Sequence, residues 1–151
     1  MKKGCICEGI IEKVEFPNRG KATVEGETVI VKNGIPGQKV RFVINKKRGK
    51  RLEGRLLEVL EKSPLERREP VCSVFPDCGG CMYQTMPYEE QLKMKQAQVK
   101  EILDRAVLGE YEYENIYGSP QEFHYRNKME FSFGDAEKDG PLTLGLHKKG
   151  S

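Results

Sequence analysis

The chain has 151 residues, of which 37% are hydrophobic and 32% charged, a length that holds one ordinary domain or two small ones. No apolar run reaches the roughly 18 residues that span a bilayer, and the first residues lack the apolar core of a signal peptide. These features exclude an integral helical membrane protein, and we expect a cytoplasmic protein.

The charge is divided unevenly along the chain. Residues 1–62 carry 15 lysines and arginines against 8 glutamates, a balance of +7. Residues 63–151 carry 11 basic against 15 acidic side chains, a balance of −4. Such asymmetry predicts two modules, of which the first faces a polyanion.

Alternating apolar and polar residues predict short β-strands in the first module. The expected strands cover residues 5–16, 21–24, 27–32, 38–45 and 52–60. Val29 and Val31 share one face of their strand, as do Val40, Phe42 and Ile44 of theirs. Five short strands with glycine-rich turns predict a mainly β chain (α+β) that begins with a small barrel of the oligonucleotide-binding (OB) type.

The 52–61 stretch also permits a helix, which Gly54 disfavours. Residues 63–70, with two prolines and four charges, are expected to form a linker. Near the end of the chain, residues 124–133 and 142–149 predict the two strands of a hairpin, joined by a turn at 136–141.

One amphipathic helix is predicted over residues 88–107. Pro87 suits the first helical position, and Gly109 suits the end of the helix. The apolar stripe repeats at helical spacing and consists of Leu92, Val99, Leu103 and Ala106.

The five cysteines are Cys5, Cys7, Cys72, Cys78 and Cys81. An odd count without a secretory signal argues against a disulfide framework. Two thiolates separated by two residues, as in Cys78-Gly79-Gly80-Cys81, can bind one metal centre, because the turn between them brings both sulfurs to the same side. The glycines allow positive φ angles and close backbone approach, and Cys72 can reach the same centre from a preceding loop.

Three thiolates leave a fourth ligand open, since closed zinc sites and [4Fe–4S] clusters normally have four. The candidates are Cys5, Cys7, His124, His147 or a residue beyond Ser151. Cys5 and Cys7 are also explained as small apolar core residues, and the two histidines as structural or surface residues. A redox-active pair is disfavoured, because such pairs sit at the start of a helix and here a helix starts only near Pro87.

Basic side chains cluster near the end of the first module. The candidate RNA-binding residues are Arg41, Lys46, Lys47, Arg48, Lys50, Arg51 and Arg55, most of them in an expected basic loop at 46–51. Clustered cations neutralise phosphates and release counterions; the alternative is a solvated charged loop. Arg126 and Lys128 offer further phosphate contacts beside the ring of Tyr125, which is alternatively a core residue.

Residues 72–103, CSVFPDCGGCMYQTMPYEEQLKMKQAQVKEIL, resemble the iron–sulfur segment of bacterial RNA (uracil-5-)-methyltransferases, which form 5-methyluridine in ribosomal and transfer RNA. In that family a CGGC-x-x-Q motif precedes a helix with a Q-x-x-x-K pattern, matched here by Gln84, Gln91 and Lys95. Residues 1–62 resemble the family's RNA-binding TRAM domain. HYRNKMEFSF and LTLGLHKKGS resemble the start of its central β-domain.

The resemblance implies two regions: a TRAM-like barrel over 1–62, and an iron–sulfur segment, helix and beginning of a central RNA-binding domain over 63–151. It implies that Cys72, Cys78 and Cys81 hold a [4Fe–4S] cluster, with the fourth ligand beyond Ser151. The family's S-adenosylmethionine site and catalytic residues lie in a further domain. No catalytic residue is therefore assigned in this N-terminal portion, which we expect to be inactive alone.

The partner implied by the resemblance is ribosomal or transfer RNA, with no membrane and no obligate protein partner. Two alternatives remain at the level of sequence. One is a non-enzymatic RNA-binding TRAM module with a structural zinc or cluster site, and the other is a zinc-ribbon interaction protein.

Overall fold

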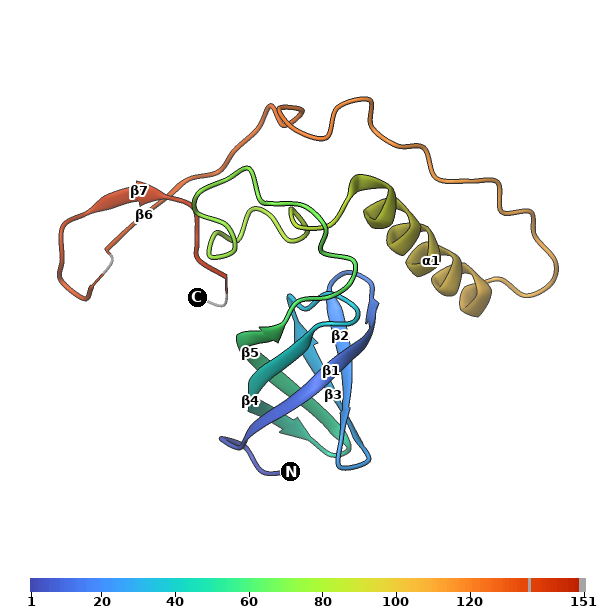
Figure 1. Cartoon of the computed structure of the whole chain (residues 1–151), viewed down its shortest axis with the longest axis horizontal. Coiled ribbons are helices and arrows are strands. Elements are labelled where there is room, and N and C mark those ends of the chain that lie inside the picture. Colours follow the sequence, from blue (N-terminus) through green and yellow to red (C-terminus); the bar gives the residue numbers. More distant parts are fainter. Residues whose placement is uncertain (136, 150–151) are drawn as a thin grey trace.

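The computed structural model describes residues 1–135 and 137–149 of the chain. Most of its regular structure is strand, with one helix (Figure 1). The elements are β1 (Ile6–Glu15), β2 (Arg19–Val24), β3 (Glu27–Lys32), β4 (Lys39–Arg48), β5 (Arg51–Glu61), α1 (Tyr88–Ala106), β6 (Ser132–Gly134) and β7 (Thr143–Gly145).

The first five strands close into a barrel in the order β1-β2-β3-β5-β4. All neighbouring pairs are antiparallel except β3 and β5, which run parallel. Parallel pairing requires a crossover, and β4 supplies it by passing to the far side of β5. This topology confirms the predicted OB-like barrel and the mainly β fold.

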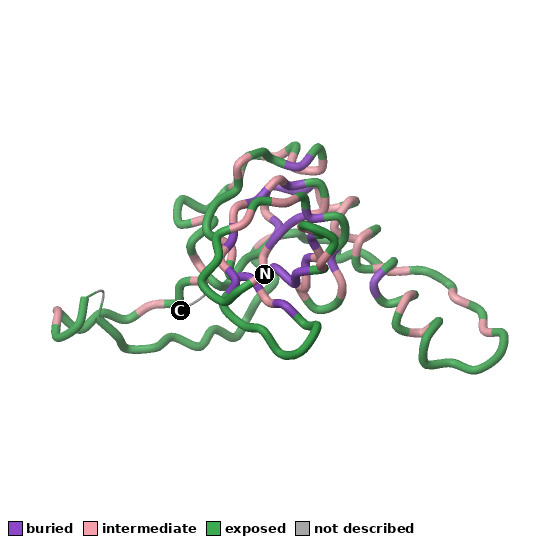
Figure 2. The backbone as a smooth tube through the Cα atoms, turned by 90° about the horizontal axis from the view of Figure 1, so that it is seen from below, coloured by how far each residue is buried: buried purple, intermediate pink, exposed green. Residues whose placement is uncertain are grey.

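The hydrophobic core fills the barrel (Figure 2). The predicted inward faces are confirmed, because Val29 and Val31 of β3 and Val40, Phe42 and Ile44 of β4 are fully buried. Alternate residues of a strand point to opposite faces, so these five positions place the remaining side chains of β3 and β4 on the outside of the barrel.

The basic stretch 46–51 differs from its prediction as a loop. Lys46 continues β4, Arg51 begins β5, and the connection between the strands is a turn at Gly49 and Lys50. Gly49 has φ +59°, a backbone conformation that glycine adopts at little cost. Strand pairing therefore fixes the backbone of most of these basic residues, so that their side chains leave the barrel at defined positions.

The predicted linker at 63–70 is packed against the barrel. Ser63 is buried and its hydroxyl donates to the carbonyl of Pro36. The Glu66 carboxylate accepts hydrogen bonds from Gln38, the Ser63 amide and Thr85. The stretch has no helix or strand, as expected of a linker, and Arg67 and Glu69 are exposed, but Ser63 and Glu66 bond it to the barrel.

A second, smaller apolar cluster joins the cysteine-containing region to the barrel. It consists of Ile35, Tyr83 and Met86, with Leu65 and Met94 packed against it. Met94 also contacts the barrel core. The segment between the barrel and α1 therefore packs against both the barrel and the helix.

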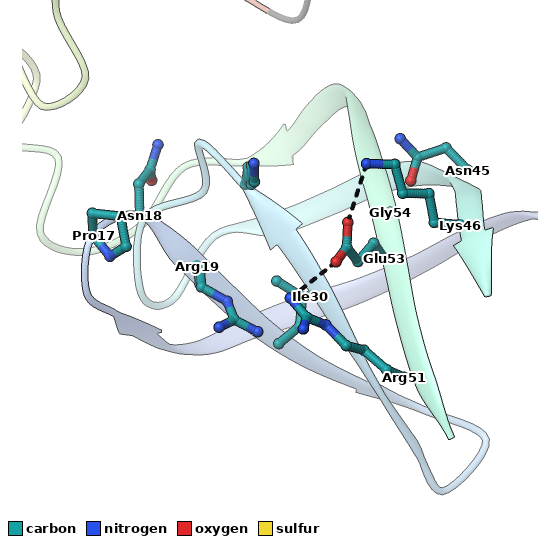
Figure 3. Close-up of a pocket in the computed structure, with 10 residues that line it drawn as sticks. Pro17, Asn18, Arg19, Ile30, Asn45, Lys46, Arg51, Glu53 and Gly54 are labelled. Atoms are coloured by element: carbon teal, nitrogen blue, oxygen red, sulfur yellow. Dashed lines mark ion pairs between the residues drawn. The ribbon is translucent and has the colours of Figure 1, made fainter. Parts of the chain in front are cut away.

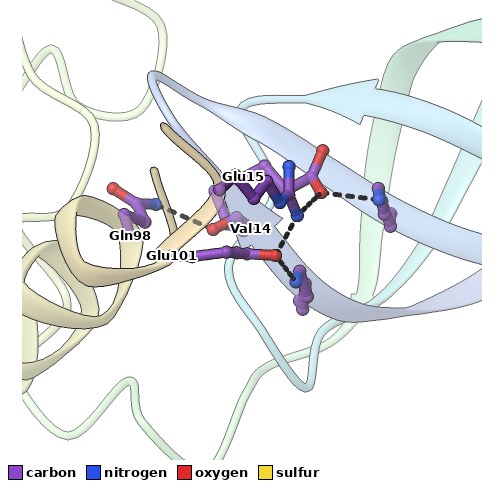
Figure 4. Close-up of polar contacts among 7 residues, drawn as sticks. Val14, Glu15, Gln98 and Glu101 are labelled. Carbon is purple, nitrogen blue, oxygen red and sulfur yellow. Dashed lines mark hydrogen bonds and ion pairs between the residues drawn. The ribbon is translucent and has the colours of Figure 1, made fainter. Parts of the chain in front are cut away.

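The helix α1 forms as predicted, ending one residue before the expected boundary, but its apolar stripe is not buried. Pro87 is the N-cap residue rather than the first helical one. Val99 is 41% exposed, whereas the buried residue of the helix is Gln98, whose amide donates to the carbonyl of Val14 in β1 (Figure 4). Besides the apolar contact of Met94, the helix packs on the end of β1 through polar contacts, which the periodicity of apolar residues did not indicate. No helix among the described residues is long and apolar enough to cross a bilayer.

The C-terminal hairpin is shorter than predicted. Strand β6 pairs with β7 over three residues each, and most of 124–131 is extended without strand partners in the described residues. Tyr125 is 66% exposed, so its alternative as a core residue is wrong. Ala136, in the predicted turn, lies outside the described residues. The segment after α1 runs in a long arc from the helix to β6 (Figure 1).

Candidate functional site

A concave surface on the outside of the barrel gathers cations from four strands. Arg19 comes from β2, Lys32 from β3, Lys46 from β4 and Arg51 from β5. The hollow has a volume of about 410 Å³, and its remaining lining residues are Pro17, Asn18, Ile30, Asn45, Glu53 and Gly54. Figure 3 shows the side chains of Arg19 and Arg51 on either side of Ile30. We call this hollow the cationic groove.

One carboxylate faces the four cations of the cationic groove. Glu53 lies 3.0 Å from Arg51 and 3.8 Å from Lys46. In the described part of the chain, neither Arg19 nor Lys32 has a carboxylate within ion-pair distance. The groove therefore carries a net balance of +3, which favours an anionic ligand.

Arg41, a predicted RNA contact, is instead held between two glutamates. Its guanidinium lies 2.8 Å from Glu8 and 2.7 Å from Glu58. The hydrogen bond to Glu8 raises the pKa of Arg41. A cation shared by two carboxylates carries no excess charge toward a phosphate, so the position of Arg41 does not favour the predicted role.

The other predicted cations of the first module divide into two groups. Lys47 donates to the backbone carbonyl of Met1 at 2.9 Å. Arg48, Lys50 and Arg55 are exposed and have no ion-pair partner among residues 1–135 and 137–149. These three lie outside the cationic groove and remain accessible to a polyanion.

The third predicted cation group lies in the extended segment before β6. Lys128 pairs with Glu130 at 2.8 Å, and both side chains are more than 80% exposed. Tyr125 and Arg126 are exposed as well. Tyr125 offers a ring face to solvent, but the structure does not join this group to the cationic groove.

The CGGC loop is held by the segment that follows β7. Cys78 pairs with Lys148 in an antiparallel bridge, and the Gly79 amide donates to the carbonyl of His147 at 2.9 Å. A Cβ atom at Gly79 would lie 2.8 Å from that carbonyl oxygen, which confirms the expected close backbone approach. Neither Gly79 nor Gly80 has a positive φ angle, so that part of the prediction was wrong.

Two of the three predicted cluster thiols are brought close to the same amine. Partial burial lowers the pKa of Lys149, against the opposing influence of Cys81 and Cys78. The Gly80 amide also donates to the Cys78 sulfur at 3.3 Å. An amide that points at a cysteine sulfur suits a thiolate ligand of an iron–sulfur cluster, whose potential such hydrogen bonds tune.

The three cysteines have the right chemistry for an iron–sulfur cluster, but the described part of the structure does not arrange them as cluster ligands. Cys72 is exposed, and its backbone amide donates to the side chain of Gln84 at 3.2 Å. Within the described residues, no group of three or more His, Cys, Asp or Glu side chains is placed to hold one metal ion. The thiols of Cys72, Cys78 and Cys81 are thus the right donors, but the described structure does not gather all three around one point.

The fourth-ligand candidates within the chain have other surroundings. Cys5 is exposed, so its expected core role was wrong, whereas Cys7 packs against the barrel core and burial raises the pKa of its thiol. His124 is exposed with φ +60°. His147 lies 3.1 Å from the hydroxyl of Ser132. The ligand expected beyond Ser151 lies outside the described residues.

The cationic groove includes five polar residues that the sequence did not single out: Asn18, Arg19, Lys32, Asn45 and Glu53. Arg19 and Lys32 pair across β2 and β3, and Asn45 lies on β4, so they are distant from one another in sequence. The sequence did indicate that some of these side chains point outward. Lys32 follows Val31 and Asn45 follows Ile44, and because Val31 and Ile44 point into the core, their neighbours point to the outside of the barrel. The barrel topology was needed to bring them together.

Fold and site together define an OB-like barrel module with a cationic groove, joined to a cysteine-containing segment. No protein-family model matches the chain. It is 47% identical over 150 residues to an uncharacterized RNA methyltransferase of Clostridium tetani. It is 42% identical over 151 residues to one of Clostridium acetobutylicum, and 41% identical over 150 residues to one of Caldanaerobacter subterraneus.

These alignments cover 99 to 100% of this chain and 33% of each relative. The chain is therefore homologous over its whole length to proteins named RNA methyltransferases, and it spans about a third of the length of these curated relatives.

Proposed function

We propose that the chain is the RNA-binding and iron–sulfur portion of a methyltransferase that uses S-adenosylmethionine to make 5-methyluridine in ribosomal or transfer RNA. The observation that carries the proposal is the similarity of the whole chain to relatives named RNA methyltransferases. The CGGC motif and its resemblance to the uracil-5 family supply the finer assignment. The cationic groove supports contact with a polyanion.

In this proposal the residues of the chain bind and position, and none of them transfers the methyl group. Cys72, Cys78 and Cys81 supply three thiolates to a [4Fe–4S] cluster, and a residue beyond Ser151 supplies the fourth ligand. Methylation of a uracil carbon by S-adenosylmethionine requires no net electron transfer. The cluster therefore has a structural role that ties the CGGC loop to the segment after β7, where Cys78 already pairs with Lys148.

The cluster assignment is tested by the metal content of a protein that extends the chain to the length of its relatives. After anaerobic purification we expect about four iron atoms per protein and broad visible absorption. Replacement of Cys78 or Cys81 by serine should remove most of the iron. Cys5→Ser is the matched control, because Cys5 is an exposed thiol outside the CGGC loop. Stoichiometric zinc without iron would contradict the assignment.

The reaction is tested on the same extended protein with labelled S-adenosylmethionine and unmodified ribosomal and transfer RNA. Label recovered as 5-methyluridine supports the proposal. Label recovered only in another nucleoside would retain an RNA methyltransferase and reject the uracil-5 assignment. Residues 1–151 alone should transfer no label, since the proposal assigns no catalytic role to any of them.

A further inference from the structure

The cationic groove has features that a general affinity for polyanions does not require. Its four cations come from four strands and surround a hollow with an apolar floor, rather than lying along a flat face. We propose that the groove binds one unpaired nucleotide of an RNA strand, with its phosphate on Arg19 and Lys32 and its base on the apolar floor. This inference rests on the proposed function in taking RNA as the polyanion.

The charge distribution places the phosphate on one side of the groove. Glu53 occupies the side of Lys46 and Arg51, at 3.8 and 3.0 Å. Arg19 and Lys32, on the neighbouring strands β2 and β3, have no carboxylate partner among the described residues. An arginine and a lysine without counter-charges provide charge-assisted hydrogen bonds to phosphate oxygens, and the arginine can bind two of them at once.

The floor and walls of the groove suit a nucleoside. Ile30 points outward from β3 yet is only 8% exposed, and Pro17 also lines the groove, so both contribute apolar surface to its lining. The amide of Asn45, which has no hydrogen-bond partner in the described part of the chain, offers a donor and an acceptor to a base edge. A volume of about 410 Å³ exceeds what a phosphate ion fills and falls within the usual range for small-molecule sites.

The shape favours an unpaired nucleotide over a duplex. In an RNA helix the bases are stacked inside, and proteins contact mainly the phosphates and the 2′-hydroxyls. A hollow with an apolar floor reaches a base only when that base has left the stack. An adjoining hollow of about 800 Å³ shares Lys32 and Asn45 with the groove and continues past Arg55 to Lys149 beside the CGGC loop. A single strand can follow this path from the barrel to the cysteine segment.

The wall of the groove is fixed by the cysteine segment. Asn18 donates to the side chain of Asn33 at 2.7 Å and accepts from the Asn33 amide at 3.2 Å. The hydroxyl of Tyr83, two residues after Cys81, donates to the same Asn18 oxygen at 3.4 Å. The loop that carries Pro17 is therefore held in place before a ligand arrives, which lowers the entropic cost of binding.

The test compares two doubly substituted forms of the full chain that lose the same charge. Arg19→Gln with Lys32→Gln removes the proposed phosphate contacts. Lys2→Gln with Lys3→Gln is the matched control, because these exposed lysines lie outside the groove. The probes are an oligouridine of about ten nucleotides, within the site sizes of single OB barrels, and a fully paired RNA duplex of the same length.

We expect the groove variant to bind oligouridine about tenfold more weakly, and the control variant to stay within about twofold of the parent chain. The log–log salt slope of the groove variant should fall by about 0.7, because neutralisation of one single-strand phosphate is lost. The parent chain should bind the oligouridine more tightly than the duplex. Arg19→Lys with Lys32→Arg should restore most of the affinity.

Equal losses in the two charge-matched variants would overturn the proposal, as would tighter binding of the duplex than of the oligouridine. If the double groove variant does not fold, Lys32→Gln alone, at an exposed position, is compared with Lys2→Gln by the same criteria. Failure here leaves the iron content and methyl transfer of the extended protein unaffected. The inference can therefore fail without the proposed function failing.

Discussion

A side chain at position 54 would collide with the centre of the barrel. A Cβ atom on Gly54 would lie 2.7 Å from Phe42 Cδ2 and 3.3 Å from Val31 Cγ2. Both neighbours are fully buried, so neither has free space to move into. Over-packing of this kind destabilises proteins by about 1–3 kcal/mol. We therefore expect Gly54→Ala to lower the free energy of unfolding by an amount in this range.

The measurement for Gly54→Ala is urea denaturation followed by far-ultraviolet circular dichroism. Gly134→Ala is the matched control, because nothing lies within 4 Å of a Cβ atom at that position. Its effect should stay within about 0.5 kcal/mol. A Gly54→Ala protein as stable as the control would mean that Phe42 adjusts without cost.

Individual residues show where sequence reasoning reached its limit. The buried alternation of Val40, Phe42 and Ile44 was predictable, because it depends only on the period of a strand. The neutralisation of Arg41 was not, since Glu8 and Glu58 reach it from two other strands. Charge clustered along the sequence indicates a basic region, but cross-strand pairing decides which of its side chains keep excess charge.

For the helix α1, the sequence predicted the boundaries but not the contacts with the barrel. Its boundaries followed from Pro87 and the helical pattern, which are local signals. The face that meets the barrel did not, because the contact depends on polar partners at the end of β1. Strands 124–133 and 142–149 were predicted too long for a related reason, since alternation gives strand tendency while ladder length depends on the partner strand.

Gln98 makes a buried polar contact between α1 and the barrel. Its amide donates to the Val14 carbonyl at 2.8 Å, and the residue is 7% exposed (Figure 4). Gln98→Ala leaves this buried carbonyl without its partner, which costs about 1–3 kcal/mol. We expect α1 to detach more often, with amide hydrogen exchange in the helix about 5–150 times faster.

The control for Gln98→Ala is Lys95→Ala on an exposed position of the same helix. It tests whether a general change in helix stability accounts for the result, and exchange in α1 should change little. Faster exchange in the barrel strands as well as in α1 would show that Gln98 supports the whole fold rather than the contact between helix and barrel.

Ion pairs around the same contact make it sensitive to acid. Hydrogen bonding to Lys13 lowers the pKa of Glu101, and hydrogen bonding to Lys21 lowers the pKa of Glu15. Arg105 on α1 pairs with both carboxylates. A carboxyl group whose pKa is lower in the folded state stabilises it above the unfolded pKa, and this stabilisation is lost as the pH falls through the folded pKa.

We therefore expect the contact between α1 and β1 to be strongest above the ordinary glutamate pKa of 4.5 and to weaken as the pH falls below it. Carboxyl carbon shifts measured by NMR between neutral and acid pH give the titration of Glu15 and Glu101, and amide shifts of α1 report the contact. Glu101→Gln should make the contact less dependent on pH. Titration of both carboxyls at or above 4.5 would contradict the expectation.

In the molecule as a whole, all strands of the barrel come from the first module, but the barrel also forms hydrogen bonds with residues that follow it. All five strands lie between Ile6 and Glu61, within the predicted module 1–62. Beyond that boundary, Ser63 bonds to Pro36, and Glu66 bonds to Gln38. Composition suggested a linker at 63–70, because prolines and charges are common in linkers; the partners of those charges could be seen only in three dimensions.

The hydrogen bonds of the barrel continue past its last strand to Ser63 and Glu66. We expect a 1–62 fragment to fold as the five-stranded barrel, because its core residues all lie within it. A 1–70 fragment should be more stable by about 1–3 kcal/mol, since it adds the hydrogen bonds of Ser63 and Glu66. Urea midpoints and the dispersion of amide NMR spectra measure the stability and the folding of both fragments.

Ser63→Ala with Glu66→Gln in the 1–70 fragment should remove most of this gain in stability. A disordered 1–62 fragment beside a well-dispersed full chain would show instead that the barrel depends on the later segment, and equal stability of the two fragments would mean that these contacts contribute nothing to the barrel.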